Sequence, residues 1–98
     1  MAQREVIWSL RAKNDRIKIL EFWIEHNKSS IYSRKLNNLF KEAAKFIAEY
    51  PEIGRITEDK KARIKVVRDY LIVYDVYKST VVILTIFDSR RNPESLQT

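Results

Sequence analysis

Beyond a short β-prone segment at residues 5–9, the spacing of hydrophobic residues changes once along this chain, close to residue 62. Before that point, two long segments carry apolar residues at intervals of three or four, which is the spacing of amphipathic helices. Beyond it, apolar and polar residues alternate or form short β-branched runs, which is typical of strands. The sequence therefore predicts a helical part followed by a β part.

Two helices are predicted in the first part. The first spans about residues 12–27, with apolar positions at Ile17, Leu20, Trp23 and Ile24. The second follows Ser30, a predicted N-cap whose hydroxyl accepts a hydrogen bond from an early backbone N–H. Its apolar stripe consists of Leu36, Leu39, Phe40, Ala43, Ile47 and Tyr50. Pro51 ends this helix, because proline disfavours helical geometry in the residue before it.

Four strands complete the prediction. A short strand at residues 5–9 precedes the helices, and three more follow at about 62–67, 70–77 and 80–87, joined by tight turns. Residues 52–55 form a turn around Gly54, the only glycine. The order β-α-α-β-β-β predicts an α+β fold in which two helices pack on one face of a largely antiparallel sheet. A length of 98 residues fits a single domain, 1–98, with a polar C-terminal tail from about residue 89.

Composition excludes several kinds of chemistry. The chain has no cysteine, so it has no disulfide, thiolate nucleophile or cysteine metal site, which fits a reducing cytoplasm. A single glycine excludes glycine-rich phosphate loops. The only histidine, His26, is interpreted as a solvated helix-end residue near the negative end of the helix dipole. We therefore expect no metal and no cofactor.

The charge balance points to an anionic partner. Nineteen Lys and Arg against thirteen Asp and Glu give a net charge of +6 and a pI near 9.7. Such an excess attracts nucleic acid, anionic lipid or an acidic protein. Insertion into a membrane is not expected, because the longest apolar run, residues 80–87, is far shorter than the ~20 residues that a span needs.

Basic residues cluster in the last third of the sequence and form the candidate site. On a strand, Arg63 and Lys65 project to one face and Ile64 and Val66 to the other, which predicts a basic row facing solvent. The candidate partner-binding residues are Arg55, Lys60, Lys61, Arg63, Lys65, Arg68, Arg90 and Arg91. The row could hold RNA phosphates or an acidic protein, or it could be a solvated sheet edge whose lysines oppose aggregation. The aromatic residues expected in the core are Trp8, Trp23, Phe40, Phe46 and Phe87.

The order and spacing of these pieces resemble a known family over nearly the whole chain. They are Ile7-Trp8-Ser9, Phe22-Trp23, Tyr50-Pro51 with Gly54-Arg55, the run 70–74 and the run 83–93. Together they look like a RelE/ParE-type toxin of bacterial type II toxin–antitoxin systems. The resemblance implies a cytoplasmic growth inhibitor that a cognate, acidic antitoxin covers and neutralises. A homodimer and a toxin–antitoxin hetero-oligomer are both open.

The family divides by target. The resemblance to RelE-like members implies a ribosome-dependent mRNA endoribonuclease, with Lys65, Arg63 and Arg90 as catalytic candidates, whereas ParE-like members inhibit DNA gyrase without a nuclease centre. The strand position that carries an arginine in RelE-like toxins is Leu71 here, and Pro93, Glu94 and Leu96 stand where a late tyrosine is expected. These departures favour the ParE-like function over the nuclease. A basic nucleic-acid-binding module is the second alternative.

Overall fold

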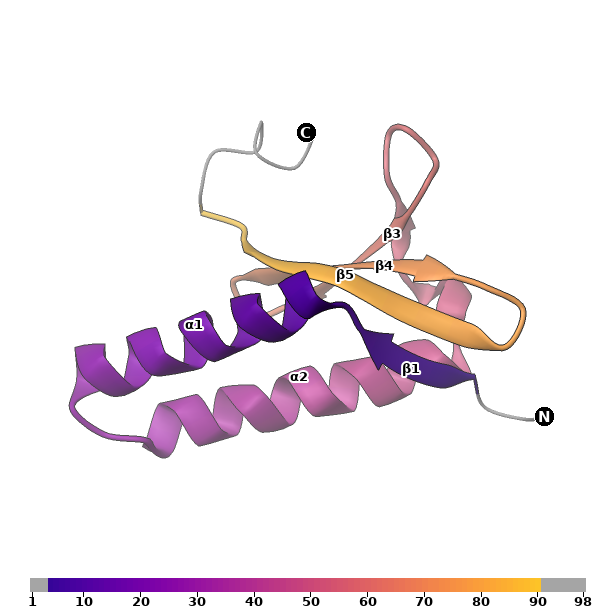
Figure 1. The fold of residues 1–98 in the computed structure, drawn as a ribbon. Helices are drawn as coiled ribbons and strands as arrows, with labels where there is room; N and C mark the ends of the chain where they lie inside the picture. Colours follow the sequence, from indigo (N-terminus) through magenta and orange to yellow (C-terminus); the bar gives the residue numbers. More distant parts are fainter. Residues whose placement is uncertain (1–3, 91–98) are drawn as a thin grey trace.

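The computed structural model describes residues 4–90 and has the predicted order of elements, with one strand added (Figure 1). The elements are β1 (Glu5–Trp8), α1 (Leu10–Asn27), α2 (Ile31–Glu49), the 3-10 turn η1 (Pro51–Ile53), β2 (Arg55–Ile56), β3 (Arg63–Val67), β4 (Tyr70–Val76) and β5 (Thr80–Asp88). The predicted turn at 52–55 thus divides into η1 and the two-residue strand β2, which is too short to give a periodic signal in the sequence.

The strands form one sheet in the order β1-β5-β4-β3-β2. β1 pairs with β5 in parallel, and the other neighbours are antiparallel. Both helices lie on the same side of the sheet, below it in Figure 1. The α+β fold with two helices on one face of a largely antiparallel sheet is therefore confirmed.

The first helix begins earlier than predicted because Ser9 caps it. The Ser9 Oγ accepts a hydrogen bond from the Ala12 N–H at 3.0 Å and donates to the Leu84 carbonyl at 2.9 Å. The cap therefore fixes the start of α1 at Leu10 and ties it to β5 where β1 ends. Farther along α1, Asp15 accepts hydrogen bonds from the hydroxyl and backbone groups of β5 at Thr85 and Ile86. Side chains of α1 thus close the edge of β5 that β1 leaves open.

The second helix starts where it was predicted but without the predicted cap. Ser30 precedes α2 with φ −91° and ψ 0°, and its side chain makes no capping hydrogen bond. The reason is its backbone geometry, since a capping residue is normally extended. The neighbouring Ser29 Oγ accepts a hydrogen bond from the Ile31 N–H at 3.3 Å instead. Residue 49 is the last of α2, shortly before Pro51.

The core lies between α2 and the central strands. Its largest fully buried side chains are Tyr74, Phe40, Leu36, Ile47, Ile72, Ile83 and Val81. Of the aromatic residues expected in the core, Phe40 is fully buried, and Trp8 and Trp23 are partly buried against the core. The prediction is wrong for Phe46, which is 42% exposed on the flank of α2, and for Phe87, which lies outside the core cluster.

Candidate partner-binding surfaces

The prediction of a solvent-facing basic row on β3 is wrong for its two central residues. Arg63 pairs across the strands with Tyr74, and Lys65 pairs with Ile72, both of which are fully buried on the helix side of the sheet. Because directly paired residues share a face, Arg63 and Lys65 also lie on the helix side, and both are partly buried. Val66, which was expected to point inward, is 57% exposed.

Arg63 holds the turn between α2 and β2. Its guanidinium Nη1 donates to the carbonyl of Glu52 at 3.2 Å and to that of Gly54 at 2.8 Å. The buried Tyr74 hydroxyl lies beside it, donating to the Pro51 carbonyl at 2.7 Å and accepting from the Gly54 N–H at 2.9 Å. Burial raises the pKa of Tyr74, so this hydroxyl stays protonated at neutral pH. Arg63 therefore has a structural role in this turn.

Lys65 borders an exposed apolar hollow that the sequence analysis did not identify. Its Nζ lies 5.8 Å from the centre of the Phe46 ring. The hollow, here called the α2 hollow, is lined by Phe46, Tyr50, Glu52 and Ile53. Phe46, Tyr50 and Ile53 are 42%, 55% and 51% exposed. Tyr50 was predicted to belong to the apolar stripe of the second helix, but it is exposed together with Phe46, four residues before it, and Ile53, three residues after it. This spacing was the signal in the sequence for a second apolar flank.

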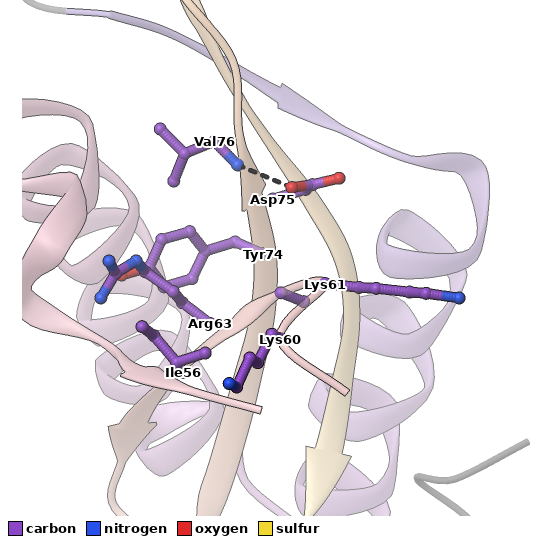
Figure 2. A pocket seen from close by; sticks show the side chains of 8 residues that line it. Ile56, Lys60, Lys61, Arg63, Tyr74, Asp75 and Val76 are labelled. Atoms are coloured by element: carbon purple, nitrogen blue, oxygen red, sulfur yellow. Dashed lines mark hydrogen bonds between the residues drawn. The ribbon is translucent and has the colours of Figure 1, made fainter. Parts of the chain in front are cut away.

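Lys60 and Lys61 lie on the loop before β3, at one end of the sheet. The loop is held by Asp59, which accepts hydrogen bonds from the Thr57 hydroxyl and the Lys61 N–H. These hydrogen bonds, the one from Thr57 foremost, lower the pKa of Asp59. Both lysines border a small pocket together with Arg63, but Figure 2 shows the charged ends of the three side chains pointing in different directions. They do not converge on one anion.

Arg68 and Arg90 lie at the opposite end of β3. Arg68 occupies the turn between β3 and β4 with φ 56°, in the left-handed region. The chain just after β5 is held against this turn, because the Ser89 N–H donates a hydrogen bond to the Asp69 carbonyl at 2.8 Å. Arg90 makes two hydrogen bonds of 3.0 Å to Asp88, which raise the pKa of its guanidinium.

The candidate cations thus occupy separate places rather than one row. Arg55 is exposed on β2, next to the turn that Arg63 holds. Arg91 lies outside the described residues.

The face of the sheet opposite the helices carries an apolar patch on its central strands. β3 and β4 contribute Ile64, Val66, Leu71 and Val73 to it, since these residues alternate with the side chains that face the helices. Leu71 pairs with Phe87 of β5 on the same face. Leu71, the position at which RelE-like toxins carry an arginine, therefore stands in an apolar surface.

Within residues 4–90, no group of three or more His, Cys, Asp or Glu side chains could hold a metal ion. In the same range, no helix is both long and apolar enough to cross a membrane.

These features define a class of protein: a small α+β domain with two helices on one face of a largely antiparallel sheet, the fold expected of RelE/ParE-type toxins. The family model described as the ParE toxin of the type II toxin–antitoxin system parDE matches residues 6–93. The chain therefore belongs to the ParE toxin family, and such a system implies an antitoxin partner.

Comparison with solved structures supports the same fold. A chain of the chromosomal ParDE toxin–antitoxin system from P. aeruginosa superposes with a TM-score of 0.77 at 17% sequence identity. The match covers 88% of this chain and 96% of the other. The search of curated proteins gives no match.

Proposed function

We propose that this ParE-family toxin acts in the cytoplasm by inhibiting DNA gyrase and does not cut RNA. The observation that carries the proposal is the apolar sheet face around Leu71, where the nuclease branch of the superfamily places an arginine. Poisoning a large enzyme needs a binding surface and no catalytic centre of the toxin's own.

The positions of the three catalytic candidates support the same conclusion. Cleavage of RNA at its 2′-hydroxyl needs a proton acceptor, a proton donor and positive charge at a single phosphate. The Arg63 guanidinium donates hydrogen bonds to backbone carbonyls, the Lys65 ammonium lies over the Phe46 ring, and the Arg90 guanidinium donates hydrogen bonds to the Asp88 carboxylate. Arg63 pairs across the strands with Tyr74 of β4, and Asp88, which holds Arg90, pairs with Tyr70 of β4. These two positions on β4 are about 13 Å apart at ~3.3 Å per residue.

The target is tested with the purified toxin in two parallel assays. We expect the toxin to stop ATP-dependent supercoiling by gyrase and to increase gyrase-linked DNA breaks, and the cognate antitoxin to reverse both effects. The same preparation is added to a translating extract, in which mRNA is expected to remain intact. New 5′ ends in mRNA without any effect on supercoiling would support the ribosome-dependent endoribonuclease and overturn the proposal.

We further propose that the antitoxin covers the α2 hollow and contacts the cations around it. The hollow offers three exposed apolar side chains, and Lys65 at its rim supplies a positive charge. A segment with apolar residues flanked by Asp or Glu matches that combination. The remaining candidate contacts for acidic side chains are Arg55, Lys60, Lys61, Arg68, Arg90 and Arg91. Arg63 contributes by holding the turn that forms one wall.

The hollow is tested by two isoleucine variants. Ile53→Ala removes an exposed side chain inside the hollow, and Ile31→Ala removes one at the far end of α2. We expect Ile53→Ala to weaken antitoxin binding by about tenfold, which is about 1.4 kcal/mol, and Ile31→Ala to have no effect in calorimetric titration. Equal affinities of the two variants would place the antitoxin elsewhere.

A further inference from the structure

Helix α1 carries an arginine in the middle of its core-facing side. At about 100° per residue, Arg16 lies about 40° around the helix from the buried Ala12 and about 20° from Trp23, which packs against the core. An apolar residue is expected at such a position. Arg16 is partly buried there and contacts side chains of α2 and β1. The contacts of its guanidinium therefore indicate why a cation stands at this position.

Most of the hydrogen-bond donors of Arg16 are unused inside the protein. Its Nε donates to the Asn37 Oδ1 of α2 at 2.8 Å, and its Cζ lies 4.9 Å from the centre of the Trp8 ring. Within residues 4–90, no hydrogen bond or ion pair engages the other N–H groups of this guanidinium. Burial lowers the pKa of Arg16, because the charged form loses hydration that no carboxylate replaces. An anion beside Arg16 would supply that missing interaction.

Two lysines border the same place. Lys13 lies three residues before Arg16 on α1, and Lys41 lies four residues after Asn37 on α2, and both are exposed. The two helices run antiparallel (Figure 1). Both lysines therefore lie about one turn from the Arg16–Asn37 hydrogen bond, in the same direction. We name Lys13, Arg16, Asn37 and Lys41 the hairpin cluster.

The acidic residues nearest to the hairpin cluster on these two helices are directed elsewhere. Asp15 accepts hydrogen bonds from Thr85 and Ile86 of β5. Glu42 lies about 140° around α2 from Asn37, on another side of that helix. The three cations of the cluster make no ion pair among residues 4–90. The cluster is therefore a concentration of uncompensated positive charge around one partly buried arginine.

This pattern of charge fits a row of phosphates better than one carboxylate. A carboxylate side chain brings a single negative charge, which Arg16 alone satisfies. A nucleic-acid strand brings a charge at each nucleotide, so Arg16 and the Asn37 amide can hold one phosphate while the two lysines meet its neighbours. We propose that the hairpin cluster binds the phosphate backbone of duplex DNA. The choice of DNA rests on the proposed function, because gyrase holds duplex DNA.

DNA binding by the full-length toxin, freed from antitoxin and without gyrase, tests the cluster. Fluorescence anisotropy of a short labelled duplex measures the association constant K at several salt concentrations. We expect log K to fall with log[salt] with a slope of about −2 to −3, since each neutralised phosphate contributes about −0.9. Arg16→Leu should weaken binding by about tenfold at low salt and reduce the slope by about one unit. Lys13→Ala and Lys41→Ala should each reduce the slope by a similar amount.

Lys18→Leu is the matched control. It removes the same charge on the opposite side of α1, about 160° from Arg16, and should leave both the affinity and the slope nearly unchanged. Urea denaturation checks the fold of Arg16→Leu. Leucine suits the core-facing side of α1, so the urea midpoint should not fall. A residue whose role was only to tie α1 to Asn37 would lower that midpoint when replaced.

Four results would overturn the proposal. They are a folded toxin that binds no DNA at low salt, equal losses of affinity in Arg16→Leu and Lys18→Leu, a lower urea midpoint in Arg16→Leu with unchanged DNA binding in both lysine variants, and unchanged DNA binding in Arg16→Leu with a loss of antitoxin affinity. The last result would assign the cluster to an acidic protein.

The supercoiling assay separates this proposal from the proposed function. A toxin that binds DNA through the cluster but leaves gyrase active would refute gyrase inhibition alone. A toxin that inhibits gyrase but does not bind DNA would refute the DNA site alone.

Discussion

Replacing Gly54 with alanine probes the turn that connects α2 to the sheet. Gly54 has φ −77° and ψ 148°, a conformation open to any residue, so the requirement for glycine is spatial. A Cβ at this position would lie 2.3 Å from the Tyr74 hydroxyl, 2.8 Å from the Tyr74 ring and 2.9 Å from the Ile64 carbonyl. Tyr74 is fully buried and cannot move aside without disturbing the core.

The size of the effect follows from these contacts. Overpacking a core costs about 1–3 kcal/mol, and each hydrogen bond that the displaced hydroxyl loses costs about 1 kcal/mol more. The Tyr74 hydroxyl makes two such bonds, to Pro51 and from Gly54. We therefore expect Gly54→Ala to lower the free energy of unfolding by about 3–5 kcal/mol, a large part of the ~5–15 kcal/mol typical of a domain.

Urea denaturation of the purified toxin measures this loss, with the exposed neighbour Arg55→Ala as a control expected to change stability by less than about 0.5 kcal/mol. Tyr74→Phe removes the nearest clashing atom, so Gly54→Ala should cost at least about 1 kcal/mol less in that background than in the natural chain. The ring and carbonyl contacts remain, so some cost persists. A loss below about 0.5 kcal/mol for Gly54→Ala alone would refute the steric argument.

Three further outcomes are expected. Asp15→Ala leaves donors on β5 without their acceptor, so unfolding should become about 1–2 kcal/mol easier and amide exchange along the far half of β5 faster. The pKa values of Tyr70 and Tyr74 are raised, mainly by burial, so their contribution to stability is complete below pH ~10 and lost as pH rises through the raised values. In Tyr74→Phe, the free energy of unfolding should therefore fall less steeply with rising pH in the alkaline range than in the natural chain. Arg68→Gly relieves a left-handed residue and should stabilise the toxin by up to about 1 kcal/mol while weakening antitoxin binding.

The sequence predicts the element order because helical and strand periodicities are each maintained over long segments. It places the boundaries of the predicted elements within one or two residues, since Pro51 and the polar turn residues interrupt the pattern. The parallel pairing of β1 with β5 is a long-range contact that periodicity cannot reveal. The start of α1 depends on Ser9, whose hydroxyl also binds β5, a contact that is likewise invisible in local sequence.

The candidate site was less predictable, and β3 shows why. The alternation of Arg63, Ile64, Lys65 and Val66 identifies a strand but not which face is covered, because β4 presents apolar side chains to both faces beside β3. The usual assignment of apolar residues to the core therefore exchanges the two faces of the strand. What places Arg63 on the helix side is the pair of carbonyls at residues 52 and 54, which only the folded turn brings within its reach.

The separation of the cations sets a minimum length for an antitoxin segment that neutralises both ends of β3. Lys61 and Arg68 lie at opposite ends of that strand, seven residues apart, or about 23 Å at ~3.3 Å per residue. One compact acidic cluster cannot reach both ends, because exposed charges about 23 Å apart are well beyond the ~8 Å screening length at physiological salt. An extended segment needs about seven residues to cover that distance, and a helix needs about fifteen at ~1.5 Å each. Shortening the antitoxin from either end should therefore reduce its affinity in separate steps. Each step should remove the part of the salt dependence of binding that comes from the cations at one end of β3. Titration of truncated antitoxins against the Lys61→Ala and Arg68→Ala toxins measures those steps. A single loss that affects both toxin variants equally would contradict the separation of the cations into two contact sites.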